Sequence, residues 1–216
     1  MERELLNRID TEISSFESIS LSNMDKVKLM SRKDTKFIFE VNDLPSLLSA
    51  VKPFYKVAEI NDKRISEYKT DYYDTQQFDL YNAHHNGKLN RNKVRYREYV
   101  NSELSFFEIK FKDNKNKTVK FRIESWRKSN EMSKEDVEFL QRKTPYKKED
   151  LKKVLVNKFR RITLVNVEIR ERITIDVSLE FDNFNKKKSL NNLVVLEVKQ
   201  EKVTYDSRVK KTINQE

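Results

Sequence analysis

NRNKVRYREYVNSELSFFEIKFKDNKNKTVKFRI, residues 90–123, alternates charged and apolar side chains along three successive runs. In each run, charged residues take alternate positions, and the positions between them are mostly aromatic or aliphatic. Successive side chains of a β-strand point to opposite faces of the sheet, so this period of two predicts three strands. Residues 101–102 and 113–116 have the composition of the turns that would join these strands. The segment therefore predicts an antiparallel meander with one apolar face and one strongly cationic face.

The cationic face of this meander brings like charges close together. If the strands pair in chain order, several cations become near neighbours, namely Arg95, Arg97, Lys110, Lys120 and Arg122. Two like charges ~5 Å apart repel by roughly 3 kcal/mol at an effective dielectric constant of about 20. A solvated sheet face normally mixes charges of both signs, and such a face is the alternative interpretation. We interpret the excess of cations as an anion-binding surface.

Length and composition favour one domain with anionic partners. The 216 residues are 37% hydrophobic, which is enough for a core, and the formal net charge is +10. One glycine and three prolines argue against flexible linkers. The chain has no cysteine, which excludes disulfides and thiolate metal sites, and no apolar run approaches the ~20 residues of a spanning helix. We expect a cytoplasmic protein without a transmembrane segment.

The remaining sequence predicts helices by apolar spacing and strands by alternation. The expected helices cover residues 2–16, 24–30, 44–51, 133–140 and 148–157, and the fourth begins at a capping box formed by Ser133 and Asp136. The expected strands outside the meander cover residues 34–40, 64–75, 159–166, 168–180 and 193–199. Roughly eight strands, mostly antiparallel and with helices between them, indicate an α+β fold whose sheet could close into a barrel.

The later strands repeat the charged pattern of the meander. Their polar faces carry Lys36 on one strand, then Glu168, Arg170, Arg172, Thr174 and Asp176 on another, then Glu197 and Lys199. A few carboxylates among many cations suit Mg²⁺ or Mn²⁺ shared with phosphate oxygens, and the candidates are Glu108, Glu124 and Glu197. Gly87 alone cannot form a glycine-rich phosphate loop, so Arg forks and Lys ammonium groups would bind the phosphates.

Six segments follow one another across nearly the whole chain in the order of a known family. They are LMSRKDTKFIF (29–39), YKTDYYDT (68–75), HHNGKLNRNKVRYREY (84–99), FFEIKFKDNKNKTVKFRI (106–123), RITIDVSL (172–179) and VVLEVK (194–199). Together they resemble the vacuolar transporter chaperone (VTC) domain, the polyphosphate polymerase branch of the triphosphate tunnel metalloenzymes. The order of all six, rather than any one segment, carries the resemblance.

The resemblance implies an eight-stranded antiparallel β-barrel, a tunnel lined by basic residues, with flanking helices. In that family a nucleoside triphosphate such as ATP donates its terminal phosphate to a growing inorganic polyphosphate chain, with Mn²⁺ or Mg²⁺ as cofactor. The matching phosphate-binding residues are Lys36, Arg95, Arg97, Lys110, Lys120, Arg122, Arg161, Arg172 and Lys199. The catalytic set within them is Lys36, Arg95, Arg97, Lys110, Arg172 and Lys199. Glu197 falls where the family places its metal ligand, and Glu108 is the second choice.

Two departures from the family pattern accompany this resemblance. The family usually continues after its final strand with a helix that carries a Ser-Lys-aromatic motif, whereas this chain ends at Glu216. We therefore expect a single domain over residues 1–216 with a truncated C-terminal helix. Phe159 stands where some members of the family have Tyr, which removes a hydroxyl contact to phosphate.

Three other functions compete with polymerisation. A triphosphate hydrolase of the tunnel superfamily usually has a Glu-x-Glu-x-Lys strand, which RKDTKFIF (32–39) lacks, so hydrolysis ranks lower. A non-catalytic sensor of polyphosphate or inositol phosphates would share the basic face. A nucleic-acid binder is disfavoured because the aromatic residues mostly fall on the face opposite the cations, which suits a core better than stacking on bases; they are Tyr96, Phe107, Phe111 and Phe121. The sequence identifies no membrane-protein partner.

Overall fold

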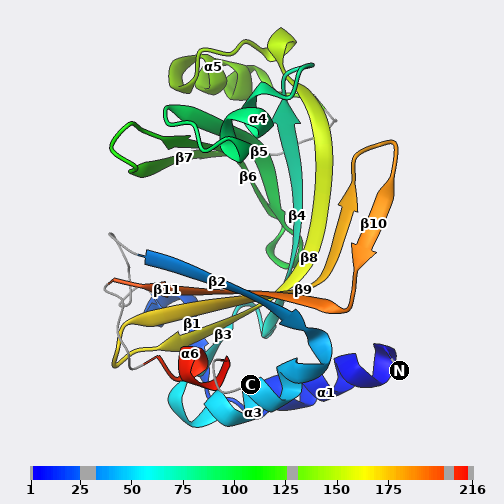
Figure 1. Cartoon of the computed structure of the whole chain (residues 1–216), viewed down its shortest axis with the longest axis vertical. Coiled ribbons are helices and arrows are strands. Elements are labelled where there is room, and N and C mark those ends of the chain that lie inside the picture. The colour runs from blue at the N-terminus through cyan, green and yellow to red at the C-terminus, as the bar shows by residue number, and fades with distance from the viewer. Residues whose placement is uncertain (1, 25–32, 126–130, 202–206, 214–216) are drawn as a thin grey trace. The chain divides into compact units, whose positions relative to one another are not determined.

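The protein is described by a computed structural model that covers residues 2–24, 33–125, 131–201 and 207–213. Within these residues, 11 strands form one sheet, whose main path runs β2-β11-β9-β8-β4-β5-β6-β7 (Figure 1). The strands of this path are β2 (Lys33–Glu40), β11 (Leu193–Gln200), β9 (Glu171–Asp182), β8 (Lys152–Asn166), β4 (Ile65–Asp74), β5 (Arg91–Tyr99), β6 (Leu104–Lys112) and β7 (Thr118–Glu124). Off the path, β1 (Ser18–Ser20) pairs in parallel with β3 (Lys56–Glu59), and β10 (Lys187–Leu190) pairs with β9.

The chain divides into two compact units. The first consists of residues 1–67, 159–179 and 189–216, and the second of residues 68–158 and 180–188. The long strands β4, β8 and β9 contribute residues to both units. Each unit is therefore described by itself.

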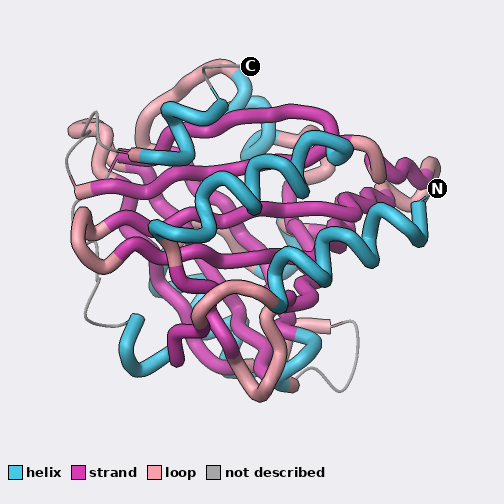
Figure 2. The backbone as a smooth tube through the Cα atoms, turned by 90° about the horizontal axis from the view of Figure 1, so that it is seen from below, coloured by secondary structure: helices cyan, strands magenta, loops and turns pink. Residues whose placement is uncertain are grey.

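The first unit covers one face of its strands with helices α1 (Glu2–Ser14), α3 (Leu44–Val51) and α6 (Arg208–Ile213) (Figures 1 and 2). As the apolar spacing predicts, one stripe of α1 enters the core. Side chains of the three helices and of β8, β9 and β11 form that core, including Ile9, Ile13, Leu44, Leu48, Ile162, Ile173, Ile175, Leu196, Val198 and Val209. The other face of β9 and β11 carries the polar residues of the alternation.

The second unit confirms the predicted meander, formed by β5, β6 and β7. Its apolar face packs on α4 (Asp79–His85) and α5 (Lys134–Lys143), with a core that includes Leu80, Val94, Tyr96, Phe107, Ile109, Phe139 and Leu140. The capping box at α5 is also confirmed, because the Ser133 hydroxyl accepts from the Asp136 amide at 3.1 Å and the Asp136 carboxylate accepts from the Ser133 amide at 2.9 Å. The alternation of the sequence thus determines which face is free for a ligand.

The prediction of a helix over residues 148–157 is wrong. A short 3₁₀ turn, Lys148–Asp150, is followed by β8, which starts at Lys152. The spacing of Leu151, Val154 and Leu155 fits a helix as well as a strand, but β8 lies between β9 and β4 and is held from both sides. Lys153 pairs with a carboxylate of β4, Asp71, at 3.5 Å. Strand pairing with distant segments therefore overrides the local pattern.

The structure also differs from the expectation at the start of β9, and the described residues leave out most of one expected helix. β9 begins at Glu171 rather than at Glu168, because Arg170 lies in a turn with a φ of 50°. Arg170 instead pairs with Glu201 at 3.2 Å on an exposed surface. The helix expected over residues 24–30 lies almost entirely outside the described residues, although a short helix, α2 (Leu21–Met24), ends where it would begin.

The α+β fold, an antiparallel sheet with flanking helices, agrees with the sequence-based prediction. The registers of β2–β11, β11–β9, β4–β5, β5–β6 and β6–β7 are all antiparallel. Within the described residues the eight-stranded path is open, with β2 and β7 as its two ends, rather than a fully closed barrel. The eight strands expected along the chain are therefore present, and they form an open sheet.

Candidate anion site

On the cationic face of the meander, one row of cations crosses β5, β6 and β7. Lys93 lies opposite Lys110, which lies opposite Lys120 on the next strand. One step along, Arg91 lies opposite Lys112, so a second row also joins like charges. Directly opposed like charges destabilise a sheet unless solvent or an anion separates them. Of the five cations predicted to be neighbours, the register joins Lys110 and Lys120 directly, whereas Arg95 and Arg122 both lie opposite Glu108.

Glu108 is the one carboxylate placed at the centre of this face among the described residues of β5 to β7. It is fully buried, and its Oε2 accepts from Nε and Nη2 of Arg95 at 2.8 and 2.6 Å. Its Oε1 pairs with Lys120. Burial alone would raise the pKa of Glu108, but Arg95 and Lys120 outweigh burial and lower this pKa. The carboxylate thus acts as a fixed counter-ion that holds two of the predicted phosphate-binding cations.

Lys110 has an unusual protonation equilibrium. Burial lowers its pKa to about 7, and the neighbouring charges of Arg95, Arg97 and Lys120 act in the same direction. Glu108 opposes the shift without cancelling it. A bound anion would place a compensating negative charge beside the ammonium group, and would raise the pKa of Lys110 again. Anion binding is therefore expected to be coupled to proton uptake by Lys110.

Triphosphate binding at pH 8 is expected to take up close to one proton, because Lys110 is mostly neutral in the free protein and charged in the complex. Calorimetric titration in two buffers with different ionisation enthalpies measures this uptake. Replacing Lys110 with Met is expected to remove most of it, whereas Lys115→Met, on the exposed β6–β7 turn, is the control that keeps it. Equal uptake in wild type and Lys110→Met would contradict the assignment.

Three side chains of β4 complete this surface, and the sequence pattern did not reveal them. Thr70 accepts from Nε of Arg97 at 3.3 Å, and the guanidinium of Arg97 lies 5.5 Å from the ring centre of Tyr68. Tyr72 lies opposite Arg95 in the register, and the two side chains form a hydrogen bond. Burial would lower the pKa of Arg95, but Tyr72 and Glu108 outweigh burial and raise this pKa. The sequence predicts this strand, but only the register shows which cation each of its residues meets.

The first unit holds a second group of predicted residues around Glu197. Lys199 donates to its Oε2 at 2.5 Å and to the hydroxyl of Thr174 at 2.9 Å. Lys36, directly opposite Glu197 on β2, lies 3.9 Å from its Oε1. Burial would raise the pKa of Glu197, but the three cations Lys199, Lys36 and Arg161 lower it. Glu197 is therefore ionised and partly exposed.

Arg161 and Arg172 lie on the polar faces of neighbouring strands β8 and β9. Arg161 forms a two-pronged ion pair with Asp176, at 2.5 Å from Nε to Oδ1 and 2.6 Å from Nη2 to Oδ2. Nη2 of Arg172 donates to the Met24 carbonyl at 3.2 Å. Asp176 was predicted to share this face, but its role as the partner of Arg161 depends on strand pairing that the sequence does not show.

A divalent metal bound by Glu197 or by Glu108 would need oxygen ligands in addition to that one side chain. Within the described part of the chain, no group of three His, Asp or Glu residues is placed to hold a metal ion. Mg²⁺ is commonly bound by one or two carboxylates together with substrate phosphates and water. Glu197 fits that arrangement better than Glu108, because its side chain is 20% exposed and its Oε1 has only the distant Lys36 at 3.9 Å, whereas Glu108 is fully buried between Arg95 and Lys120.

The predicted residues thus fall into two groups, one in each unit. Lys36, Arg161, Arg172, Glu197 and Lys199 belong to the first unit. Arg95, Arg97, Glu108, Lys110, Lys120 and Arg122 belong to the second. The tunnel that the resemblance implies, with residues such as Arg95, Arg97, Lys110 and Arg172 lining it together, stays a prediction.

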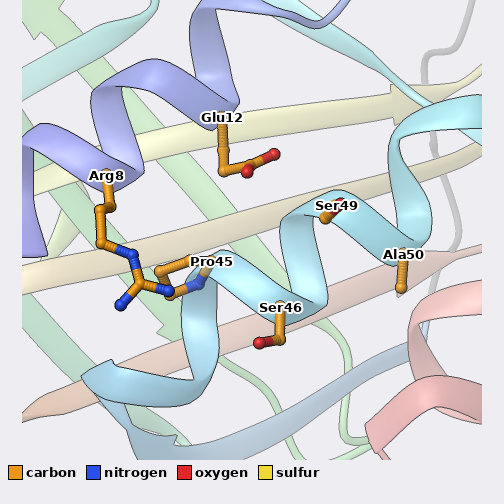
Figure 3. Close-up of a pocket in the computed structure, with 6 residues that line it drawn as sticks. All are labelled: Arg8, Glu12, Pro45, Ser46, Ser49 and Ala50. Carbon is orange, nitrogen blue, oxygen red and sulfur yellow. The ribbon is translucent and has the colours of Figure 1, made fainter.

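A separate pocket of about 450 Å³ lies between α1 and α3 of the first unit. Figure 3 shows Arg8 and Glu12 on α1 facing small residues of α3, Pro45, Ser46, Ser49 and Ala50. None of the predicted site residues lines it.

In the described segments, no helix has the length and apolar character to cross a membrane.

The chain belongs to the VTC domain family, which matches residues 31–216. No curated protein sequence matches at a significant level. Family membership and the cationic surfaces together support an enzyme of triphosphate or polyphosphate chemistry.

Several solved structures are similar to this chain at low identity. One is a protein from Vibrio parahaemolyticus, provisionally assigned as an adenylate cyclase, which is 13% identical over 86% of this chain and 84% of its own, with a TM-score of 0.47. Another, from Bacillus halodurans and with the same provisional assignment, is 12% identical over 86% and 89%, with a TM-score of 0.48. A provisional adenylyl cyclase from Hippeastrum, reported to have a dominant triphosphatase activity, is 15% identical over 86% and 85%, with a TM-score of 0.46. These likenesses are too distant to assign residue roles.

Proposed function

We propose that this protein is a polyphosphate polymerase, which transfers the terminal phosphate of a nucleoside triphosphate to a growing polyphosphate chain. The observation that carries the proposal is the row formed by Lys93, Lys110 and Lys120 across three strands. An isolated phosphate cannot neutralise such a row, whereas a chain of phosphates can lie along it. Membership in the VTC domain family supports the same substrate class.

In this proposal the cations bind and position both phosphate chains. An oxygen of the terminal phosphate of the acceptor attacks the γ-phosphorus, and the bond between that phosphorus and the β–γ bridging oxygen breaks. The products are a nucleoside diphosphate and a chain longer by one phosphate. Arg97, Lys110 and Arg122 of the meander offset the charge of the phosphates that they bind. Lys36 and Lys199 are candidate phosphate-binding cations of the first unit. Glu197 would hold Mg²⁺ or Mn²⁺, which supplies further neutralisation of the charge on the transferred group.

Incubation of the full chain with ATP and Mn²⁺ tests the reaction type. We expect polyphosphate and ADP to appear together, with little free phosphate. Parallel assays for the three products separate the alternatives: a hydrolase gives ADP and free phosphate without polyphosphate, and a sensor binds ATP without turnover. Arg97→Ala, which removes a cation held by Thr70, serves as the binding-deficient control.

A further inference from the structure

Three aromatic rings lie on the cationic face of the second unit, not in its core. The ring centres of Tyr68 and Tyr99 are 5.0 Å apart, and those of Tyr99 and Phe106 are 5.8 Å apart, in an edge-to-face arrangement. All three side chains are partly exposed, whereas Tyr96 and Phe107 on the opposite face are 2% and 0% exposed. Burial in the core therefore does not explain the trio.

The trio occupies one end of the cationic surface. Along β5 the positions on this face run Tyr99, Arg97, Arg95, Lys93 and Arg91, with about 7 Å between successive positions. Tyr68 lies opposite Tyr99, and Phe106 lies opposite Arg97. The aromatic end is thus followed directly by the cations.

Two arginines connect the rings to the cations. The guanidinium of Arg97 lies 5.5 Å from the ring centre of Tyr68, and that of Arg122 lies 4.5 Å from the ring centre of Phe106. Stacking of this kind fixes the position of a guanidinium beside an aromatic surface. A ligand with an aromatic ring joined to phosphates matches both parts of the arrangement, and its phosphates would reach Arg97 and Arg122 first.

The geometry points to Tyr68, Tyr99 and Phe106 as the platform on which the base of the nucleoside triphosphate stacks. The base then lies at the end of β5 marked by Tyr99, and the phosphates extend over Arg97 toward Lys93 and Lys110. This inference rests on the proposed function, and it adds a way for the protein to distinguish a nucleotide donor from inorganic triphosphate. Inorganic triphosphate carries no ring and gains nothing from the platform.

Tyr99 offers the cleanest test, because its ring contacts the other two rings while the arginines stack on Tyr68 and Phe106. ATP and inorganic triphosphate are titrated separately into the full chain by calorimetry, with EDTA present to prevent turnover. Tyr99→Leu is expected to raise the Kd for ATP by about tenfold, or ~1.4 kcal/mol, and to leave the Kd for inorganic triphosphate unchanged. Tyr99→Phe, which keeps the ring, is expected to bind both ligands as the wild type does.

Tyr81→Leu is the matched control, since Tyr81 is an exposed ring of the same unit that stacks on His85 of α4. It is expected to change neither Kd. Equal weakening of both ligands by Tyr99→Leu would overturn the inference, because the ring would then act only by holding the arginines. An unchanged affinity for ATP would overturn it as well. A wild-type chain that binds neither ligand would overturn the proposed function together with the platform, so the two failures are distinguishable.

Discussion

Replacing Glu108 with Gln is expected to lower the free energy of unfolding by about 3–5 kcal/mol. The carboxylate is fully buried and is bonded to Arg95 and Lys120, and the side chain of Arg95 is itself only 9% exposed. Gln keeps the shape of the side chain but leaves two cations without their counter-charge. An unpaired buried charge costs far more than the net value of the pair that it came from.

Urea unfolding at pH 7 measures this change as a lower midpoint at an unchanged slope. Glu98→Gln is the control, because Glu98 lies on the neighbouring strand β5 and pairs with Lys69 at 3.4 Å on the surface, with both side chains nearly half exposed. Such a pair contributes about 0–1 kcal/mol. If Glu108→Gln unfolds like the control, Glu108 does not stabilise the meander and its assignment as a counter-ion is wrong.

The effect of Glu108→Gln is also expected to depend on pH. Although burial opposes it, the pKa of Glu108 is lowered by Arg95 and Lys120. The stability that a lowered pKa provides is fully present above the unfolded-state value of about 4.3 and is lost as the pH falls through the folded-state value. The difference between wild type and Glu108→Gln is therefore expected to be constant near neutral pH and to shrink below about pH 4.

The meander could be predicted from the sequence because its alternation is local. Alternation along each strand alone predicts that four apolar residues share one face, and the structure places all four in the core: Val94, Tyr96, Phe107 and Ile109. The failure at residues 148–157 has the opposite origin. There the spacing is ambiguous, and what decides the conformation is pairing with β4 and β9, which are remote in the sequence.

The same distinction holds for the candidate site. The alternation of side chains along a strand predicts which cations share a face, so the sequence alone is enough to group Arg95, Lys110 and Lys120. The alternation does not predict which charged side chains of neighbouring strands contact each other. The pairing of Arg161 with Asp176 and the contact of Arg97 with Thr70 both join different strands, and each depends on register. Residues that neutralise or orient a cation are therefore harder to predict than the cations themselves.

Glu197→Gln is expected to abolish metal-dependent turnover and to leave the Kd for triphosphate within about tenfold of wild type, a difference of ~1.4 kcal/mol. Gln keeps the shape of the side chain and removes the negative charge that would hold a divalent metal beside the phosphates. Lys199 and Lys36, which flank this carboxylate, stay in place to bind phosphate. Arg97→Ala is expected to act in the opposite way, because its primary effect is to weaken the binding of triphosphate.

Turnover is measured as ADP released over a range of Mn²⁺ concentrations, and binding as calorimetric Kd for inorganic triphosphate without metal. Glu201→Gln is the matched control, because Glu201 follows the same strand but pairs with Arg170 on an exposed surface, with its side chain 48% exposed. The control is expected to keep both turnover and binding. If Glu197→Gln turns over normally while a folded Glu108→Gln is inactive, the assignment of the metal ligand to Glu197 is wrong, and the metal ligand belongs on the meander.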